Sequence, residues 1–253
     1  MTIITDPLFY MVAVPALIVL GLSKGGFAGI GVIATPLTAL YLPPLEAAAL
    51  ILPVLIVQDV ISLWWYRHDY DAWNLKVLLP GAFIGMALGW AFAAYVNDDI
   101  LRISIGLIGV GLVLYSVFLP IPAEGRKKTA LSGAFWGAVS GFTSFLSQAG
   151  GPPYQVHVLP QRLPKLTLVG TTVIFFAFVN ALKIGPYFAL GQFSTVNFAT
   201  SMVLLPIAVA GNALGIWLVR VTPMDAFYRI AYAIVFCISV MLLTQGTMGL
   251  LRG

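Results

Sequence analysis

The sequence predicts an all-α polytopic membrane protein formed from two related halves. Of its 253 residues, 60% are hydrophobic and only 9% are charged, whereas soluble domains carry about 25% charged residues. Apolar runs of about 20 residues, long enough to cross a hydrocarbon core of about 30 Å, recur along nearly the whole chain. No stretch is both polar and long enough to form a soluble domain, so residues 1–253 are expected to be one membrane domain.

The first half, about residues 1–122, opens with a long apolar stretch over 7–42. This stretch is interrupted at 22–26 and again by Pro36. Three further apolar runs, each expected to span the membrane, are 46–66, 77–96 and 100–119. A short polar linker at 120–129 then separates the halves.

The second half, about residues 129–253, follows the same order. Its opening run begins at 130 and is interrupted at 146–153, and its expected spanning helices are 167–184, 196–219 and 226–243. Only eight residues, 153–160, lie between the interruption and the polar Gln161 and Arg162, and eight helical residues cover about 12 Å. This arm cannot span, which predicts that each interrupted segment is a re-entrant or broken helical hairpin followed by three transmembrane helices.

Four patterns recur in the same order and indicate that the halves are copies. They are Leu-Ser-Lys-Gly-Gly at 22–26 with Leu-Ser-Gln-Ala-Gly-Gly at 146–151, Leu-Pro at 42–43 and 163–164, Leu-Leu-Pro with two glycines at 78–89 and 204–215, and Asp-x-x-x-Arg at 98–102 and 225–229. Their offsets drift only between 121 and 127 residues. Glycine and proline could instead merely mark helix contacts, as they often do in membrane bundles. Three crossings per half, an odd number, would make the two repeats inverted.

The basic residues support the hairpin arrangement. With an outside N-terminus, nine of the 13 Lys and Arg residues fall inside, Arg102, Lys183 and Arg252 fall outside, and Lys24 stays in the membrane. If each interrupted segment crossed as one broken helix, the split would be seven to five. Cytoplasmic loops carry an excess of Lys and Arg, so the hairpins and the outside N-terminus are expected.

The two interruptions are the expected binding site. Broken backbone is tolerated in a bilayer only where protein or a water-filled cavity covers it, and paired breaks are the best sequence indication of a transporter site. Amides at helix starts after each break, side-chain hydrogen bonds and the Lys24 charge would suit a small oxyanion such as a carboxylate, sulfite or sulfonate. The predicted substrate-binding residues are Ser23, Lys24, Gly25, Gly26, Ser147, Gln148, Gly150 and Gly151.

Asp59 and Asn180 form a further candidate polar pair. Asp59 lies thirteen residues into its apolar run, which is about 20 Å deep, and Asn180 has the equivalent position in the second half. A buried carboxylate can carry a proton, so Asp59 could couple transport to protons or make a structural hydrogen bond or ion pair. Lys24 could contact substrate or pair permanently with Asp59. The lone Cys237 is expected to be buried.

Signatures of enzymes and ATP-driven pumps are missing from the sequence. It has no His/Glu pair with metal-ligand spacing, no Gly-x-Ser-x-Gly and no P-loop. A membrane-embedded enzyme around Asp59 would need a further nucleophile or metal set, so no catalytic activity, metal or cofactor is expected. The basic residues lie at the ends of apolar runs, so no nucleic acid is expected. The expected partners are a small anion and the lipid bilayer; a coupled proton or other ion and an oligomer stay open.

At the glycine-rich segments the chain resembles the sulfite exporter TauE/SafE family of bacterial membrane transporters. The resemblance lies in the length, the two halves, Gly-Leu-Ser-Lys-Gly-Gly-Phe-Ala-Gly-Ile-Gly from residue 21 and Ser-Gln-Ala-Gly-Gly-Pro-Pro from residue 147. It implies a permease of the bacterial cytoplasmic (inner) membrane for a small sulfur-containing anion, such as sulfite or an organosulfonate (sulfoacetate or a taurine-like compound). It fixes neither the substrate nor the direction of transport. The alternatives are a passive anion channel or a carrier of another small carboxylate or oxyanion.

Overall fold

The described part of the chain is mostly helical. The computed structural model describes residues 3–27, 31, 34, 38, 44–92, 95, 97–118, 125–189 and 195–252, and these contain no strand. Five helices within this part are long and apolar enough to cross a membrane: α1 (Pro7–Gly25), α4 (Ala72–Phe92), α8 (Lys165–Ala189), α9 (Thr195–Val221) and α10 (Met224–Arg252). The others are α3 (Pro44–Tyr66), α5 (Asp98–Phe118), α6 (Ala130–Ser147), the short α7 (Gly151–Val158) and the 3-10 helix η3 (Leu159–Gln161). The expected all-α polytopic fold is confirmed.

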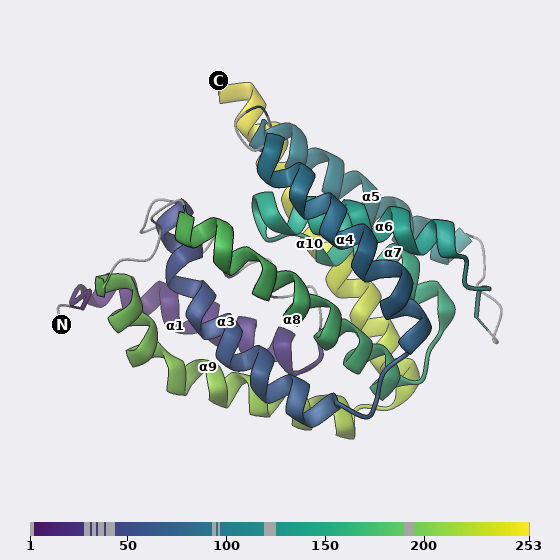
Figure 1. The fold of residues 1–253 in the computed structure, drawn as a ribbon, viewed down its shortest axis with the longest axis horizontal. Coiled ribbons are helices and arrows are strands. Elements are labelled where there is room, and N and C mark those ends of the chain that lie inside the picture. The colour runs from purple at the N-terminus through teal and green to yellow at the C-terminus, as the bar shows by residue number, and fades with distance from the viewer. Residues whose placement is uncertain are drawn as a thin grey trace.

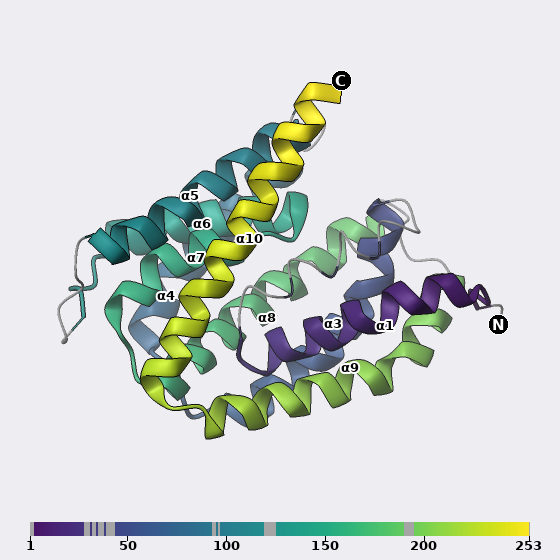
Figure 2. The same ribbon diagram turned by 180° about the vertical axis from the view of Figure 1, so that it is seen from behind.

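The helices form two groups with α8 between them. In Figure 1, α1, α3 and α9 lie on one side of the molecule, and α4, α5, α6, α7 and α10 lie on the other. The opposite view in Figure 2 shows α1 along α9 and α5 beside α10. Because α3 contacts both α8 and α9, and α4 contacts both α6 and α8, helices α3, α4 and α8 connect the groups.

Glycines allow the closest helix contacts. A Cβ added to Gly21 of α1 would lie 2.6 Å from the Ala208 carbonyl oxygen of α9, and one added to Gly85 of α4 would lie 1.9 Å from that of Ala138 in α6. Small residues at helix interfaces let backbones approach closely in a membrane bundle. The glycine-rich pattern of α4 therefore serves helix packing.

The contacts α1–α9 and α4–α6 are reciprocal between the halves. Gly21 lies opposite Ala208 and Gly25 opposite Asn212, so α1 and α9 run parallel. The same order holds for α4 and α6, where residues 81 and 85 face 134 and 138. The helix that opens each half thus packs against the corresponding later helix of the other half. This exchange is what two related halves would produce, and the inversion of the repeats stays a prediction.

The second-half hairpin is present. Helix α6 ends at Ser147 and α7 begins at Gly151. The returning arm then lies beside the start of α6, because the Arg126 amide donates to the Pro160 carbonyl at 2.8 Å and Ser132 Oγ lies 3.1 Å from His157 Nδ1. The corresponding part of the first half, 28–43, lies largely outside the described residues.

Several basic helix ends gather at one end of the molecule. Lys165 Nζ, at the start of α8, donates to the carbonyls of Arg220 and Thr222 at the end of α9, at 3.2 and 2.5 Å. Lys128 of the linker pairs with Asp71, which caps α4 through the Asn74 amide. Burial raises the pKa of Asp71, but the hydrogen bonds from Lys128 and from backbone amides outweigh it, so this pKa lies below its ordinary value.

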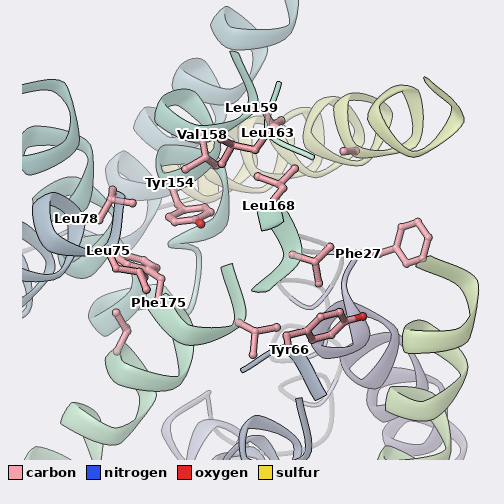
Figure 3. Close-up of a cluster of buried hydrophobic side chains, with 14 of the residues drawn as sticks. Phe27, Tyr66, Leu75, Leu78, Tyr154, Val158, Leu159, Leu163, Leu168 and Phe175 are labelled. Atoms are coloured by element: carbon pink, nitrogen blue, oxygen red, sulfur yellow. The ribbon is translucent and has the colours of Figure 1, made fainter. Parts of the chain in front are cut away.

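A buried apolar cluster packs α7 against the first turns of α8 (Figure 3). Tyr154 of α7 stacks on Phe175 of α8 with ring centroids 4.7 Å apart, and Leu168 is also buried in this cluster. The expectation for Cys237 is wrong: its side chain is exposed on α10, because that face of the helix is turned away from the bundle.

We expect Gly85→Ala to destabilise the fold. The new Cβ would lie 1.9 Å from the Ala138 carbonyl oxygen, so α4 and α6 must separate, at a cost of about 1–3 kcal/mol for overpacking. Thermal unfolding in detergent measures this change. Gly111→Ala is the matched control because its Cβ would meet nothing within 4 Å. Equal unfolding temperatures for both variants would contradict the close α4–α6 contact.

Candidate functional site

A cavity with both polar and apolar lining residues lies between the ends of α1 and α6 and the inner parts of α3 and α8. Its volume is about 80 Å³, below the range of about 300–1,000 Å³ that is usual for drug-sized ligands, so it suits only a small solute. Leu20, Ile51, Leu55, Val173 and Phe176 form its apolar wall. Its polar wall consists of Ser23, Lys24, Ser144, Gln148, Thr172 and Asn180.

Helix α3 holds the end of α1 in place. Ser62 Oγ donates to the Lys24 carbonyl at 2.8 Å, and the Tyr66 hydroxyl donates to the Gly25 carbonyl at 2.7 Å. The last carbonyls of a helix have no partner within the helix, and an unsatisfied carbonyl is costly inside a bilayer. These two bonds therefore fix the last turn of α1, which carries Lys24, against α3.

Lys24 both pairs with Asp59 and lines the cavity. Lys24 Nζ lies 2.5 Å from Asp59 Oδ1, and the two side chains are only 12% and 7% exposed. Asp59 Oδ2 accepts a hydrogen bond from Asn180 Nδ2 at 2.7 Å. The expected polar pair of Asp59 and Asn180 is thus in direct contact, and of the two roles left open for Lys24, the ion pair is formed.

A second buried cation, Lys183, belongs to the same cluster. The charge count predicts Lys183 as a helix-end cation on the outer side of the membrane; in the structure its side chain is fully buried among the helices. Its Nζ donates to Ser144 Oγ at 2.9 Å, to Gln148 Oε1 at 2.6 Å and to Asn180 Oδ1 at 3.5 Å.

Two signals could have revealed Lys183. The expected helix ends at 184, whereas α8 continues to Ala189. Lys183 therefore lies well inside the helix. Lys183 also lies three residues after Asn180, a spacing that brings both side chains to one helix face.

Gln148 reaches Lys183 through an unusual backbone. It follows α6 with φ 57° and ψ 14°, in the left-handed region that residues other than glycine rarely adopt. This conformation ends α6, and the side-chain bond to Lys183 ties the end of α6 to α8. The strained turn is therefore held at the cavity wall.

The glycines of the two segments mainly pack against other helices. A Cβ on Gly25 would lie 2.6 Å from the Asn212 carbonyl oxygen, and one on Gly150 would lie 2.7 Å from that of Ser140. Gly26 has φ 141° and caps α1, and its amide donates back to Leu22 and Ser23. Gly26 lines a neighbouring smaller cavity instead.

The helix ends at the cavity differ from those expected. Ser23, Lys24 and Gly25 form the last turn of α1, and α6 also ends here, so two carboxyl-terminal ends approach the cavity. At the start of α7, Pro152 and Pro153 have no amide hydrogen, and only Gly151 at the cavity wall could offer one. Among the described residues, side chains rather than backbone amides therefore supply most of the positive charge and hydrogen-bond donors; the amides expected after the first break, in 28–43, lie largely outside the described part of the chain.

Half of the ten predicted residues line the cavity: Ser23, Lys24, Gln148, Gly151 and Asn180. Asp59 binds two of them. Ser147 is the last residue of α6, and its side chain lies outside the described part of the structure. Among the described residues, no cluster of three or more His, Cys, Asp or Glu side chains could hold a metal ion.

A polytopic helical chain with a cationic, hydrogen-bonding cavity between its helices has the features of a membrane transport protein. The family model described as sulfite exporter TauE/SafE matches residues 13–242 of the chain. The chain belongs to this family, and it is therefore a multi-pass membrane protein of a transporter family for sulfite-like anions. Comparison with curated proteins and with solved structures finds no match.

We expect Asp59→Asn to destabilise the protein by about 3–5 kcal/mol, because removing one partner of a buried ion pair leaves the other charge uncompensated. Thermal unfolding in detergent measures the loss. The double variant Lys24→Met/Asp59→Asn removes both charges and should recover part of the stability. The buried pair would be disproved by an Asp59→Asn variant as stable as the wild type.

Proposed function

We propose that the chain is a secondary transporter that carries a small sulfur-containing anion, such as sulfite or an organosulfonate, through the cavity between α1, α3, α6 and α8. The observation that carries this proposal is Lys24, a buried cation that forms part of the cavity wall. A charge within a bilayer costs at least about 2.5–3.5 kcal/mol, so its retention beside a solute-sized cavity favours a role in binding.

The other polar groups of the wall suit a sulfonate or sulfite group. These groups carry several oxygen acceptors and no donor, and Ser23, Ser144 and Asn180 bring hydroxyl and amide donors from three helices. The apolar residues of the lining, such as Phe176 and Leu55, would accommodate a short carbon chain. Membership of the sulfite exporter family supports the same substrate class.

Alternating access is favoured over a passive channel because, among the described residues, buried side chains pack next to the cavity. Thr172 also lines a second cavity, of about 20 Å³, next to Phe27, Leu168 and Phe227. The apolar cluster of Figure 3 packs around this region, and Thr172 Oγ1 donates to the Tyr154 hydroxyl at 3.1 Å. An anion could pass this region only if these side chains moved, and alternating access in a carrier involves such a movement.

We assign the basic end of the molecule to the cytoplasmic side of a bacterial inner membrane, which puts the N-terminus outside. The positive-inside rule supports this assignment, since Lys165 at the start of α8 donates to the Arg220 and Thr222 carbonyls, and Lys128 pairs with Asp71 just before α4.

Coupling to a proton through Asp59 is part of the proposal. The Asp59 carboxylate binds Lys24 and Asn180, so its protonation would change the contacts of the cavity wall.

Counterflow in proteoliposomes tests the transport function. With unlabelled sulfite trapped inside, uptake of labelled sulfite should accelerate, because a carrier returns to the outer side with unlabelled sulfite bound. A channel gives no such acceleration. Uptake that is equally fast with empty liposomes would favour the channel, and uptake no greater than in protein-free liposomes would contradict transport of this anion.

We expect Lys24→Ala to weaken sulfite or sulfoacetate binding by roughly tenfold to a hundredfold, as for the loss of a hydrogen bond to a charged group. Calorimetric titration of purified protein measures the affinity. Since Lys24→Ala leaves Asp59 unpaired, the neutral pair Lys24→Met/Asp59→Asn is titrated alongside, and Lys127→Ala, in the exposed linker, is the control. Wild-type affinity in both Lys24 variants would remove Lys24 from the site.

A further inference from the structure

The buried cluster at the cavity contains three charged side chains. Lys24 and Lys183 contribute two ammonium groups, and Asp59 contributes one carboxylate. Taken in their ordinary ionisation states, the described residues of the cluster carry one surplus positive charge. An unbalanced charge in a medium of low dielectric is costly, so a further negative charge in the cavity would stabilise the cluster.

The hydrogen bonds locate the surplus on Lys183. Asp59 uses one carboxylate oxygen for Lys24, at 2.5 Å, and the other for the Asn180 amide, at 2.7 Å. Lys183 is held by Ser144 Oγ, Gln148 Oε1 and Asn180 Oδ1, which are all neutral oxygens. The Asn180 amide thus separates the single carboxylate from the second cation.

Lys183 is one hydrogen bond away from the cavity. Its three partners Ser144, Gln148 and Asn180 all line the cavity wall, and Lys24 lies in the same wall. An anion in the cavity would therefore meet one ammonium group directly and a second through these partners.

We propose that this cavity selects a solute with one net negative charge, and that Lys183 supplies the charge that sets this preference. The inference rests on the proposed function and narrows its substrate class to monoanions. A monoanion would neutralise the cluster, whereas a dianion would reverse its charge and a zwitterion would leave the surplus in place. Either mismatch retains part of the cost of an unbalanced buried charge.

Three two-carbon sulfonates test the preference because they differ mainly in net charge: 2-hydroxyethanesulfonate (one negative charge), sulfoacetate (two) and taurine (a zwitterion, none). Calorimetric titration of the full-length protein at neutral pH should give the tightest binding for 2-hydroxyethanesulfonate, by at least roughly tenfold, or about 1.4 kcal/mol. A tighter affinity for sulfoacetate or for taurine would overturn the proposal. Tighter binding of taurine than of 2-hydroxyethanesulfonate would be expected if Lys183 were uncharged.

Two variants test the assignment to Lys183. Lys183→Met and Lys183→Gln both remove the charge, one with an apolar and one with a polar side chain; both should reduce the preference for 2-hydroxyethanesulfonate over taurine by about tenfold. Lys183→Arg should retain the preference, as should the control Lys127→Met, which removes a charge from the exposed linker. If both neutralising variants kept the wild-type order, the role of Lys183 would be disproved.

Failure of the underlying function has a different outcome. If wild-type protein bound none of the three sulfonates and no sulfite, the proposed function would fall, and the charge preference with it. Binding of all three in any other order would overturn only the charge preference.

Discussion

The structure around the cavity depends on the Asp59 carboxylate. Its two oxygens join Lys24 at the end of α1 to Asn180 in the middle of α8, at 2.5 and 2.7 Å. Asp59 lies seven residues before the end of α3, about 10 Å along the helix axis, where a lone charge would be costly. Because each partner also lines the cavity, the interaction that makes the buried charges tolerable also shapes the cavity wall.

The way the chain satisfies its helix ends explains why side chains dominate the site. The last carbonyls of α1 accept hydrogen bonds from Ser62 and Tyr66 of α3, and Ser140 of α6 donates to the Gly150 carbonyl. These bonds leave little exposed backbone, and the carboxyl-terminal ends of α1 and α6 favour cations rather than anions. Lysines at such ends are therefore well placed, and they provide the positive charge that backbone amides were expected to supply.

Much of the fold could be predicted because it follows from apolar run length and from turn residues. The helix ends at Tyr66, Ser147 and Val221 lie close to the expected limits, and the short arm after Pro153 was expected from its length. The pairing of Asp59 with Asn180 followed from their matching places in the repeat. This reasoning misplaces Lys183. It assigns a charge near the end of an apolar run to the surface, whereas α8 continues beyond the run and keeps Lys183 inside the bundle.

The glycines show why a motif does not by itself define a site. Gly25 and Gly26 stand beside Lys24 in the sequence, yet Gly25 packs on α9 and Gly26 caps α1. Their contribution is to let α1 approach α9 and end where Lys24 meets Asp59. Asp59 and Asn180 come from opposite halves of the chain. Any movement of α3 against α8 must therefore either break their hydrogen bond or shift both side chains together. The cluster therefore links the charge of the cavity to the relative position of the two halves.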